Sequence, residues 1–193
     1  KEWYGEEFEY VPSRTFSFSF PNIETSAQAN IFVNLISRST SSASSFSLDV
    51  NGNSIGNVSI GSVAVGNTVD WFAGGNISGN FSPNSSTLNA TLNYTQGASD
   101  ANGWLNYIEV NAKRNLIFGG AQLLFRNLSS VGSGNISQFS VSNANNNFLV
   151  WDITNPLVPV LQNGNLNGNV FQFATPTDTI HQFVGFDGAN FLT

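Results

Sequence analysis

The chain has 193 residues, of which 40% are hydrophobic and only 9% are charged, and its net charge is −6. Its few basic residues form no stripe that could neutralise phosphates, and no segment approaches the roughly 18 apolar residues of a membrane helix, so the composition argues against a nucleic-acid or helical membrane protein. Because cysteine is absent, this chain has no disulfide, no thiolate metal site and no cysteine nucleophile.

Residues 1–14 hold four of the twelve acids, namely Glu2, Glu6, Glu7 and Glu9, interleaved with aromatic residues. We interpret this segment as an N-terminal arm that packs aromatics and leaves its carboxylates in water, as a solvated approach to the first strand. The chain begins at Lys1 with neither an initiator methionine nor a signal peptide, so we interpret it as a processed fragment of a larger protein.

Alternating apolar and polar residues predict strands along the rest of the chain. Residues 15–20 place phenylalanine on one face and serine on the other, which is the period of a half-buried strand. Asn51-Gly52 predicts a tight hairpin, and the Asn-Gly pairs at Asn163 and Asn167 predict further turns with positive φ. Other strands are predicted at 29–36, 46–50, 55–60, 63–72, 76–82, 87–95, 104–114, 122–127, 136–141, 148–153, 159–162, 170–174 and 180–186.

No segment has the apolar spacing and caps of a helix. Many short strands separated by turn residues are typical of an antiparallel β-sandwich, here a jelly-roll-like one. We therefore predict an all-β fold, with residues 15–193 forming a single sandwich domain.

The segment 148–160, FLVWDITNPLVPV, is apolar on both faces until Asn155-Pro156. A strand of this kind needs cover on both sides, so it is expected inside a sheet rather than at its edge. We expect Trp151 to fill the core with its indole N–H paired, and Asp152 to accept backbone hydrogen bonds in the turn that follows.

The sequence indicates no catalytic constellation. His181 is the one histidine, no nucleophile motif surrounds any serine, and a single histidine without cysteine makes zinc binding improbable, so we interpret His181 as structural. Paired carboxylates could hydrolyse glycosides, but the acids are scattered and their separations are not fixed by sequence.

Two weaker binding hypotheses stay open. Asp100 and Asn102 resemble the opening of a calcium loop, although the remaining ligand spacing and the closing glutamate are missing, and an ordinary turn is the simpler interpretation. Trp71 and Trp104 stand at strand ends, where exposed rings could stack on sugars, although most such residues fill a core. No other cofactor is indicated.

Four segments resemble one known family: 3–8 (WYGEEF), 105–127 (LNYIEVNAKRNLIFGGAQLLFRN), 148–160 and 183–193 (FVGFDGANFLT). In this order they are similar to the β-rich region of the type IX secretion system sortases, within the gingipain-type cysteine peptidases of Bacteroidetes. None of the four segments is a catalytic motif.

The resemblance implies a non-catalytic β domain that precedes a peptidase domain with a Cys–His pair, expected beyond residue 193. The family's full-length enzymes work at the outer surface of the outer membrane, where they remove a C-terminal sorting signal from secreted cargo and join the new terminus to anionic lipopolysaccharide. The expected partners are the chain's own peptidase domain, other secretion and attachment subunits, and cargo.

The leading hypothesis is thus an accessory β-sandwich that supports the peptidase domain or docks its partners. The alternative, from a different class, is a cell-surface carbohydrate-binding module that uses Trp71 and Trp104. A hydrolase that uses the scattered acids is a third option. Low charge and apolar strands also predict an exposed apolar face that a neighbouring domain covers.

Overall fold

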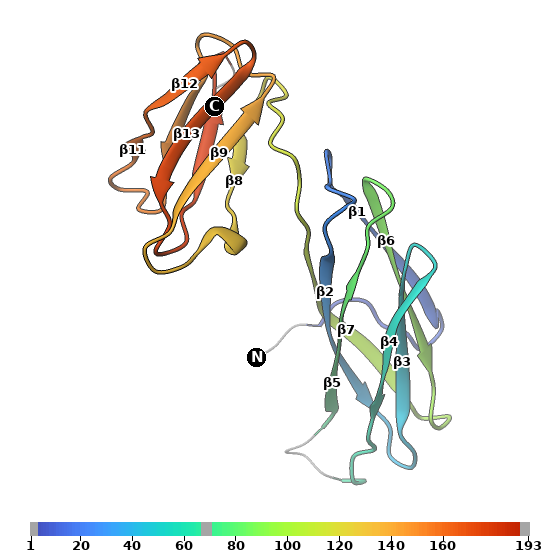
Figure 1. The fold of residues 1–193 in the computed structure, drawn as a ribbon. Coiled ribbons are helices and arrows are strands. Elements are labelled where there is room, and N and C mark those ends of the chain that lie inside the picture. The colour runs from blue at the N-terminus through green and yellow to red at the C-terminus, as the bar shows by residue number, and fades with distance from the viewer. Residues whose placement is uncertain (1–3, 67–70, 190–193) are drawn as a thin grey trace. The chain divides into compact units, whose positions relative to one another are not determined.

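The structure, a computed structural model, describes residues 4–66 and 71–189, and the regular secondary structure of these residues is almost entirely antiparallel β-strand (Figure 1). The all-β, antiparallel sandwich class predicted from the sequence is confirmed. The strands are β1 Ser13–Ser19, β2 Ala29–Arg38, β3 Ser44–Val50, β4 Asn53–Ile60, β5 Ala73–Phe81, β6 Thr87–Thr95, β7 Asn102–Asn111, β8 Leu123–Phe125, β9 Ile136–Ser142, β10 Leu149–Asp152, β11 Val160–Leu161, β12 Gly164–Asn167, β13 Val170–Pro176 and β14 Phe183–Phe186, with one 3-10 turn at Leu128–Ser130.

The chain divides into two compact units, Lys1–Arg114 and Asn115–Thr193, each with its own hydrophobic core. The sequence predicts a single sandwich over residues 15–193, so the structure differs in the number of cores. No break is visible in the sequence because the segment that opens the second unit is itself apolar. Leu116 and Phe118 exchange backbone hydrogen bonds with Ser142, which adds this segment to the edge of β9.

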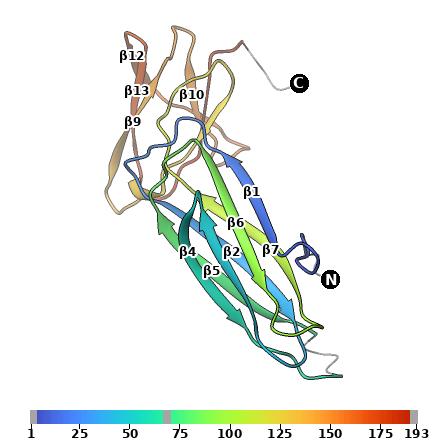
Figure 2. The same ribbon diagram turned by 90° about the vertical axis from the view of Figure 1, so that its right-hand side faces the viewer.

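The first unit is a sandwich of a four-stranded sheet, β1-β6-β3-β4, and a three-stranded sheet, β5-β2-β7. Figure 2 shows β1 and β6 of the first sheet side by side, and they pair along the whole of β1. Alternate residues of β2 and β3, such as Ile31, Val33 and Leu48, point into the core between the sheets. The Asn51-Gly52 hairpin is confirmed, with φ of 49° and 81°, the positive values that a tight antiparallel turn requires.

The N-terminal segment is hydrogen-bonded to this sandwich, unlike the solvated approach predicted from the sequence. Its amides exchange backbone hydrogen bonds with β7, through Gly5 to Leu105, Leu105 to Glu6 and Phe8 to Gly103. The Phe8 side chain is completely buried, while the carboxylates of Glu6 and Glu7 remain exposed as expected. The segment is therefore an added edge of the β5-β2-β7 sheet. The packing of Phe8 and the exposure of the two carboxylates agree with the sequence prediction, whereas the backbone pairing was not predicted.

The second unit packs the sheet β11-β10-β14-β8 against the sheet β12-β13-β9. Its core is a cluster of phenylalanine rings, in which Phe139 lies 5.2 Å from Phe173 and 5.1 Å from Phe183 between ring centroids. β10 lies between β11 and β14, so the prediction that it sits inside a sheet is confirmed.

Two local predictions are wrong in detail. The strand predicted over 63–72 is not formed in its described parts, residues 63–66 and 71–72, and residues 67–70 lie outside the described residues. The Asn163-Gly164 pair is not a turn, because Gly164 begins β12, where a Cβ would lie 2.5 Å from the Phe171 ring. Gly168, by contrast, has a φ of 61° in the turn between β12 and β13, as predicted.

Candidate functional site

The outer face of the β11-β10-β14-β8 sheet is an apolar surface. The register aligns Leu161, Trp151, Val184 and Leu124 in one row across the four strands, with Leu149 in the next row. The residues between them along the strands, Val150 and Gly185, face the core and are buried. We call this surface the apolar row and define it as Leu124, Leu149, Trp151, Leu161 and Val184.

The apolar row is exposed to a degree that is unusual for aliphatic strand residues. Leu149 is 41% and Leu161 is 42% exposed, and the loop that leads into β11 adds Leu157 at 90% and Val158 at 64%. Single exposed apolar residues are common on soluble proteins, but a contiguous set on one sheet face is a candidate binding surface. The exposed apolar face predicted from the sequence is confirmed.

Trp151 differs from its predicted place. The alternation of β10 puts it on the outer face instead of in the core, and it is partly exposed. Its indole Nε1 is buried yet has no hydrogen-bond partner within the part of the chain that the structure describes. Unpaired buried donors are rare in native proteins, and nothing in the described residues explains this one.

Asp152 and His181 tie the end of β10 to the segment before β14. The Nδ1 atom of His181 lies 2.5 Å from Oδ2 of Asp152, and the imidazole stacks on Phe183 with 5.9 Å between ring centroids. Oδ1 of Asp152 accepts hydrogen bonds from the Thr154 backbone N–H at 2.9 Å and the Thr154 hydroxyl at 2.5 Å, which confirms the predicted turn role of Asp152.

Burial raises the pKa of Asp152, but the hydrogen bonds from Thr154 and His181 together lower it further than burial raises it, so the carboxyl titrates below its usual range. The hydroxyl of Thr154 also accepts a hydrogen bond from the Gln182 backbone N–H. Within the described residues no serine or threonine hydroxyl bonds to His181. Its geometry is that of a clamp between two segments.

The two calcium candidates face different partners. Oδ2 of Asp100 accepts hydrogen bonds from the hydroxyl and the N–H of Thr40, and the first of these does most to lower the pKa of Asp100. Asn102 donates instead to Glu7, at 2.5 Å. Across residues 4–66 and 71–189, no three acidic or histidine side chains gather in a way that could hold a metal ion. The described residues around Asp100 and Asn102 therefore do not supply the set of oxygen ligands that calcium binding requires.

Trp71 and Trp104 do come together. Their ring centroids lie 6.1 Å apart at an interplanar angle of 38°, and Trp71 is 53% exposed. The Cζ atom of Arg38 lies 5.1 Å from the centroid of the Trp71 ring. The sequence pointed to both tryptophans separately, but their pairing depends on the sandwich and has no signal in the sequence.

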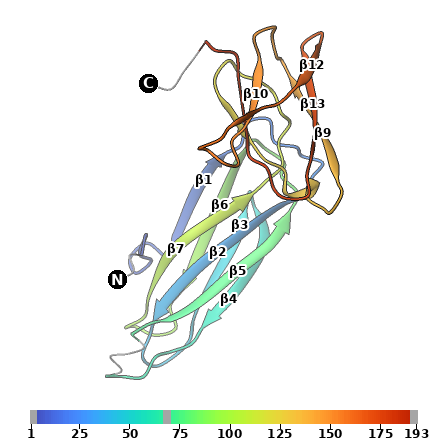
Figure 3. The same ribbon diagram turned by 90° about the vertical axis from the view of Figure 1, so that its left-hand side faces the viewer.

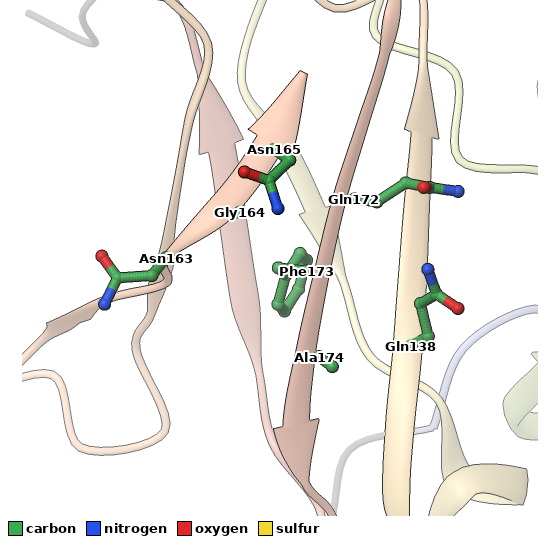
Figure 4. A pocket seen from close by; sticks show the side chains of 7 residues that line it. All are labelled: Gln138, Asn163, Gly164, Asn165, Gln172, Phe173 and Ala174. Carbon is green, nitrogen blue, oxygen red and sulfur yellow. The ribbon is translucent and has the colours of Figure 1, made fainter. Parts of the chain in front are cut away.

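A shallow pocket in the second unit is lined by Gln138, Asn163, Gly164, Asn165, Gln172, Phe173 and Ala174 (Figure 4). Its polar side chains are neutral amides from β9, β12, β13 and the residue before β12, and no titratable side chain lines it. It therefore offers no acid, base or nucleophile for a reaction. No helix among the described residues is long and apolar enough to cross a membrane.

Comparison with solved structures gives an informative match. No protein-family model and no curated protein matches the chain. The crystal structure of dimeric latent PorU from Porphyromonas gingivalis has a similar fold, with a TM-score of 0.83 and 24% sequence identity. The match covers 96% of this chain and 18% of that one, so this chain spans less than a fifth of the PorU chain. At this identity the likeness establishes the fold.

Proposed function

We propose that the chain is a non-catalytic β-sandwich region of a type IX secretion sortase-like cysteine peptidase of the gingipain type. It supports the peptidase domain at the cell surface and contributes to the docking of partner subunits and secreted cargo. The fold likeness to part of PorU and the order of the four family-like segments support this proposal.

The apolar row is the observation that carries the proposal. Leu149 and Leu161 are each about two-fifths exposed on a regular sheet face. Burial of such a surface stabilises a complex by about 25 cal/mol per Å² of apolar area. The row is uncharged, which suits a permanent contact with another domain of one polypeptide better than a transient contact with a charged ligand.

The chemistry of the chain agrees with a supporting role. It has no cysteine, so a cysteine nucleophile must come from elsewhere in such a protein. Its one histidine is held by Asp152 and stacks on Phe183, and the pocket on the second unit is lined by neutral side chains. The described residues thus offer contacts rather than a reaction centre.

The first test is to read the coding sequence beyond Thr193. We expect a following α/β region with a cysteine and a histidine of a peptidase. An open frame that lacks such a region would defeat the proposal.

The second test places a charge on the apolar row of the full-length protein. Leu149→Glu is expected to leave the isolated chain folded, because the side chain is already partly exposed, but to weaken its association with the remaining polypeptide. Ile136→Glu is the matched control, because Ile136 is 75% exposed on β9 in the other sheet. Equal behaviour of the two variants in limited proteolysis of the full-length protein would refute a docking role for the row.

A further inference from the structure

The outer face of the β5-β2-β7 sheet in the first unit has a different chemistry from the apolar row. Ile31, Val33 and Leu35 of β2 point into the core, so Phe32 and Asn34 between them point outward. Figure 3 shows β7, β2 and β5 side by side, and the register of β2 with both neighbours is continuous apart from one bulge after Asn34. The outward side chains of these strands form a flat, half-exposed surface.

Aromatic rings lie at two places on this face. One is the Trp71–Trp104 pair, where Trp104 is aligned with Ile36 of β2. The other is Phe32 with Tyr107, whose rings stack with 5.8 Å between centroids at 27°, and Tyr107 is 48% exposed. Ile36 and Phe32 are four residues apart on one strand, which is about 13 Å at the usual rise of an extended chain.

A ladder of amides lies between the two aromatic pairs. Asn106 donates from Nδ2 to Oδ1 of Asn34 at 3.0 Å, and Asn34 donates from Nδ2 to Oδ1 of Asn76 at 2.6 Å. Each amide is thereby held in a fixed orientation. At the two ends of the ladder, the Nδ2 group of Asn76 and the Oδ1 atom of Asn106 have no side-chain partner among the described residues, which leaves one donor and one acceptor on exposed residues.

The face is nearly free of charge. Of the described outward positions on the three strands, only Arg38 and Glu109 carry a charge at neutral pH, and their charges are opposite. At the edge of β7, the Glu7 carboxylate accepts a hydrogen bond from Asn102. Arg38 packs on Trp71, and Glu109 accepts a hydrogen bond from Asn111 at 2.9 Å. The face therefore has no electrostatic complementarity to a strongly charged ligand.

We propose that this aromatic–amide face, made of Phe32, Asn34, Asn76, Trp71, Trp104, Asn106 and Tyr107, binds a neutral oligosaccharide. The apolar C–H faces of sugar rings stack on the indole and phenol rings, and the hydroxyl groups bond the amide donor and acceptor between them. A protein partner would be expected to meet an apolar, dehydrated centre, whereas the centre of this face is a row of amides. The inference concerns only the first unit, so its test is independent of the test of the docking role proposed for the apolar row.

The test is affinity electrophoresis of the 193-residue chain in native gels that contain laminarin, dextran or galactomannan, with a heparin gel for comparison. We expect at least one neutral polysaccharide to retard the chain. Trp71→Ala and Trp104→Ala should each weaken that retardation about tenfold in association constant, as for the loss of one aromatic anchor. Tryptophan fluorescence should change on addition of the same polysaccharide, and in each variant this change should need a polysaccharide concentration about tenfold higher.

Tyr10→Ala is the matched control, because Tyr10 is an aromatic residue that is 85% exposed and lies outside the face. It should retain full retardation. Thermal unfolding of each variant is compared with that of the parent chain. This comparison shows whether weaker retardation comes from the lost ring or from unfolding of the variant. Absence of retardation in all three neutral gels, retardation by heparin alone, or full binding by a folded Trp71→Ala variant would each overturn the proposal.

Discussion

Phe8→Ala tests whether the N-terminal segment is structural. The ring is fully buried and makes an edge-on contact with Phe46 at 5.3 Å between centroids, and the Cζ atom of Arg14 lies 5.7 Å from its centroid. Truncation removes the whole ring and leaves a cavity between two sheets that strand pairing holds in place. Substitutions of this type cost about 3–5 kcal/mol, which is a large part of the stability of a small domain.

Urea unfolding followed by circular dichroism, with amide hydrogen exchange to assign each transition to a unit, measures this cost. With a slope of about 2 kcal/mol per M, the midpoint of the first unit should fall by roughly 2 M. The second unit has a separate core and should be unchanged. The control is Tyr10→Ala, an exposed aromatic two residues away, expected to change stability by about 0.5 kcal/mol or less. If both variants cost the same small amount, the segment is a solvated arm and the account of its packing is wrong.

Two further predictions concern polar contacts. Tyr94→Phe should destabilise the first unit by about 1 kcal/mol in urea unfolding, because the hydroxyl lies 3.0 Å from the hydroxyls of Ser37 and Ser44 in the core; an unchanged midpoint would contradict this. The pKa of Asp152 is lowered on folding, so its contribution to stability is present above the unfolded pKa of about 3.9 and is lost as pH falls through the lower folded value. Urea midpoints of the second unit should therefore fall less steeply below pH 4 in Asp152→Asn than in the parent, and parallel curves would count against the clamp.

The strands with strict alternation were predictable from the sequence. β6 has the predicted bounds 87–95, because Leu88, Leu92 and Tyr94 on one face leave a single way to bury the apolar set. β12 was missed, because residues 164–167 contain only one apolar side chain and form a strand by pairing with β13. Pairing of this kind is a property of the tertiary structure, which local patterns do not encode.

The candidate surfaces were predictable in composition but not in arrangement. The sequence pointed to an apolar face, yet it placed Trp151 in the core, because a run that is apolar on both sides does not reveal which side meets the second sheet. Trp71 and Trp104 were singled out as strand-end residues, but the amide ladder beside them depends on the register of β2 with β5 and β7. Packing of aromatic residues in the N-terminal segment was predicted, but the pairing of its backbone with β7 was not, because that pairing leaves no local pattern in the sequence.

Hydroxyl-radical footprinting of the full-length protein and of the isolated chain tests the docking role of the apolar row most directly. Leu149 and Leu161 are each about two-fifths exposed in the isolated chain, so both should be oxidised readily there. In the full-length protein their oxidation should fall severalfold, while that of Ile136 on the other sheet should stay the same. Equal oxidation of Leu149 and Leu161 in the two proteins would show that no domain covers the row and would contradict the proposed function.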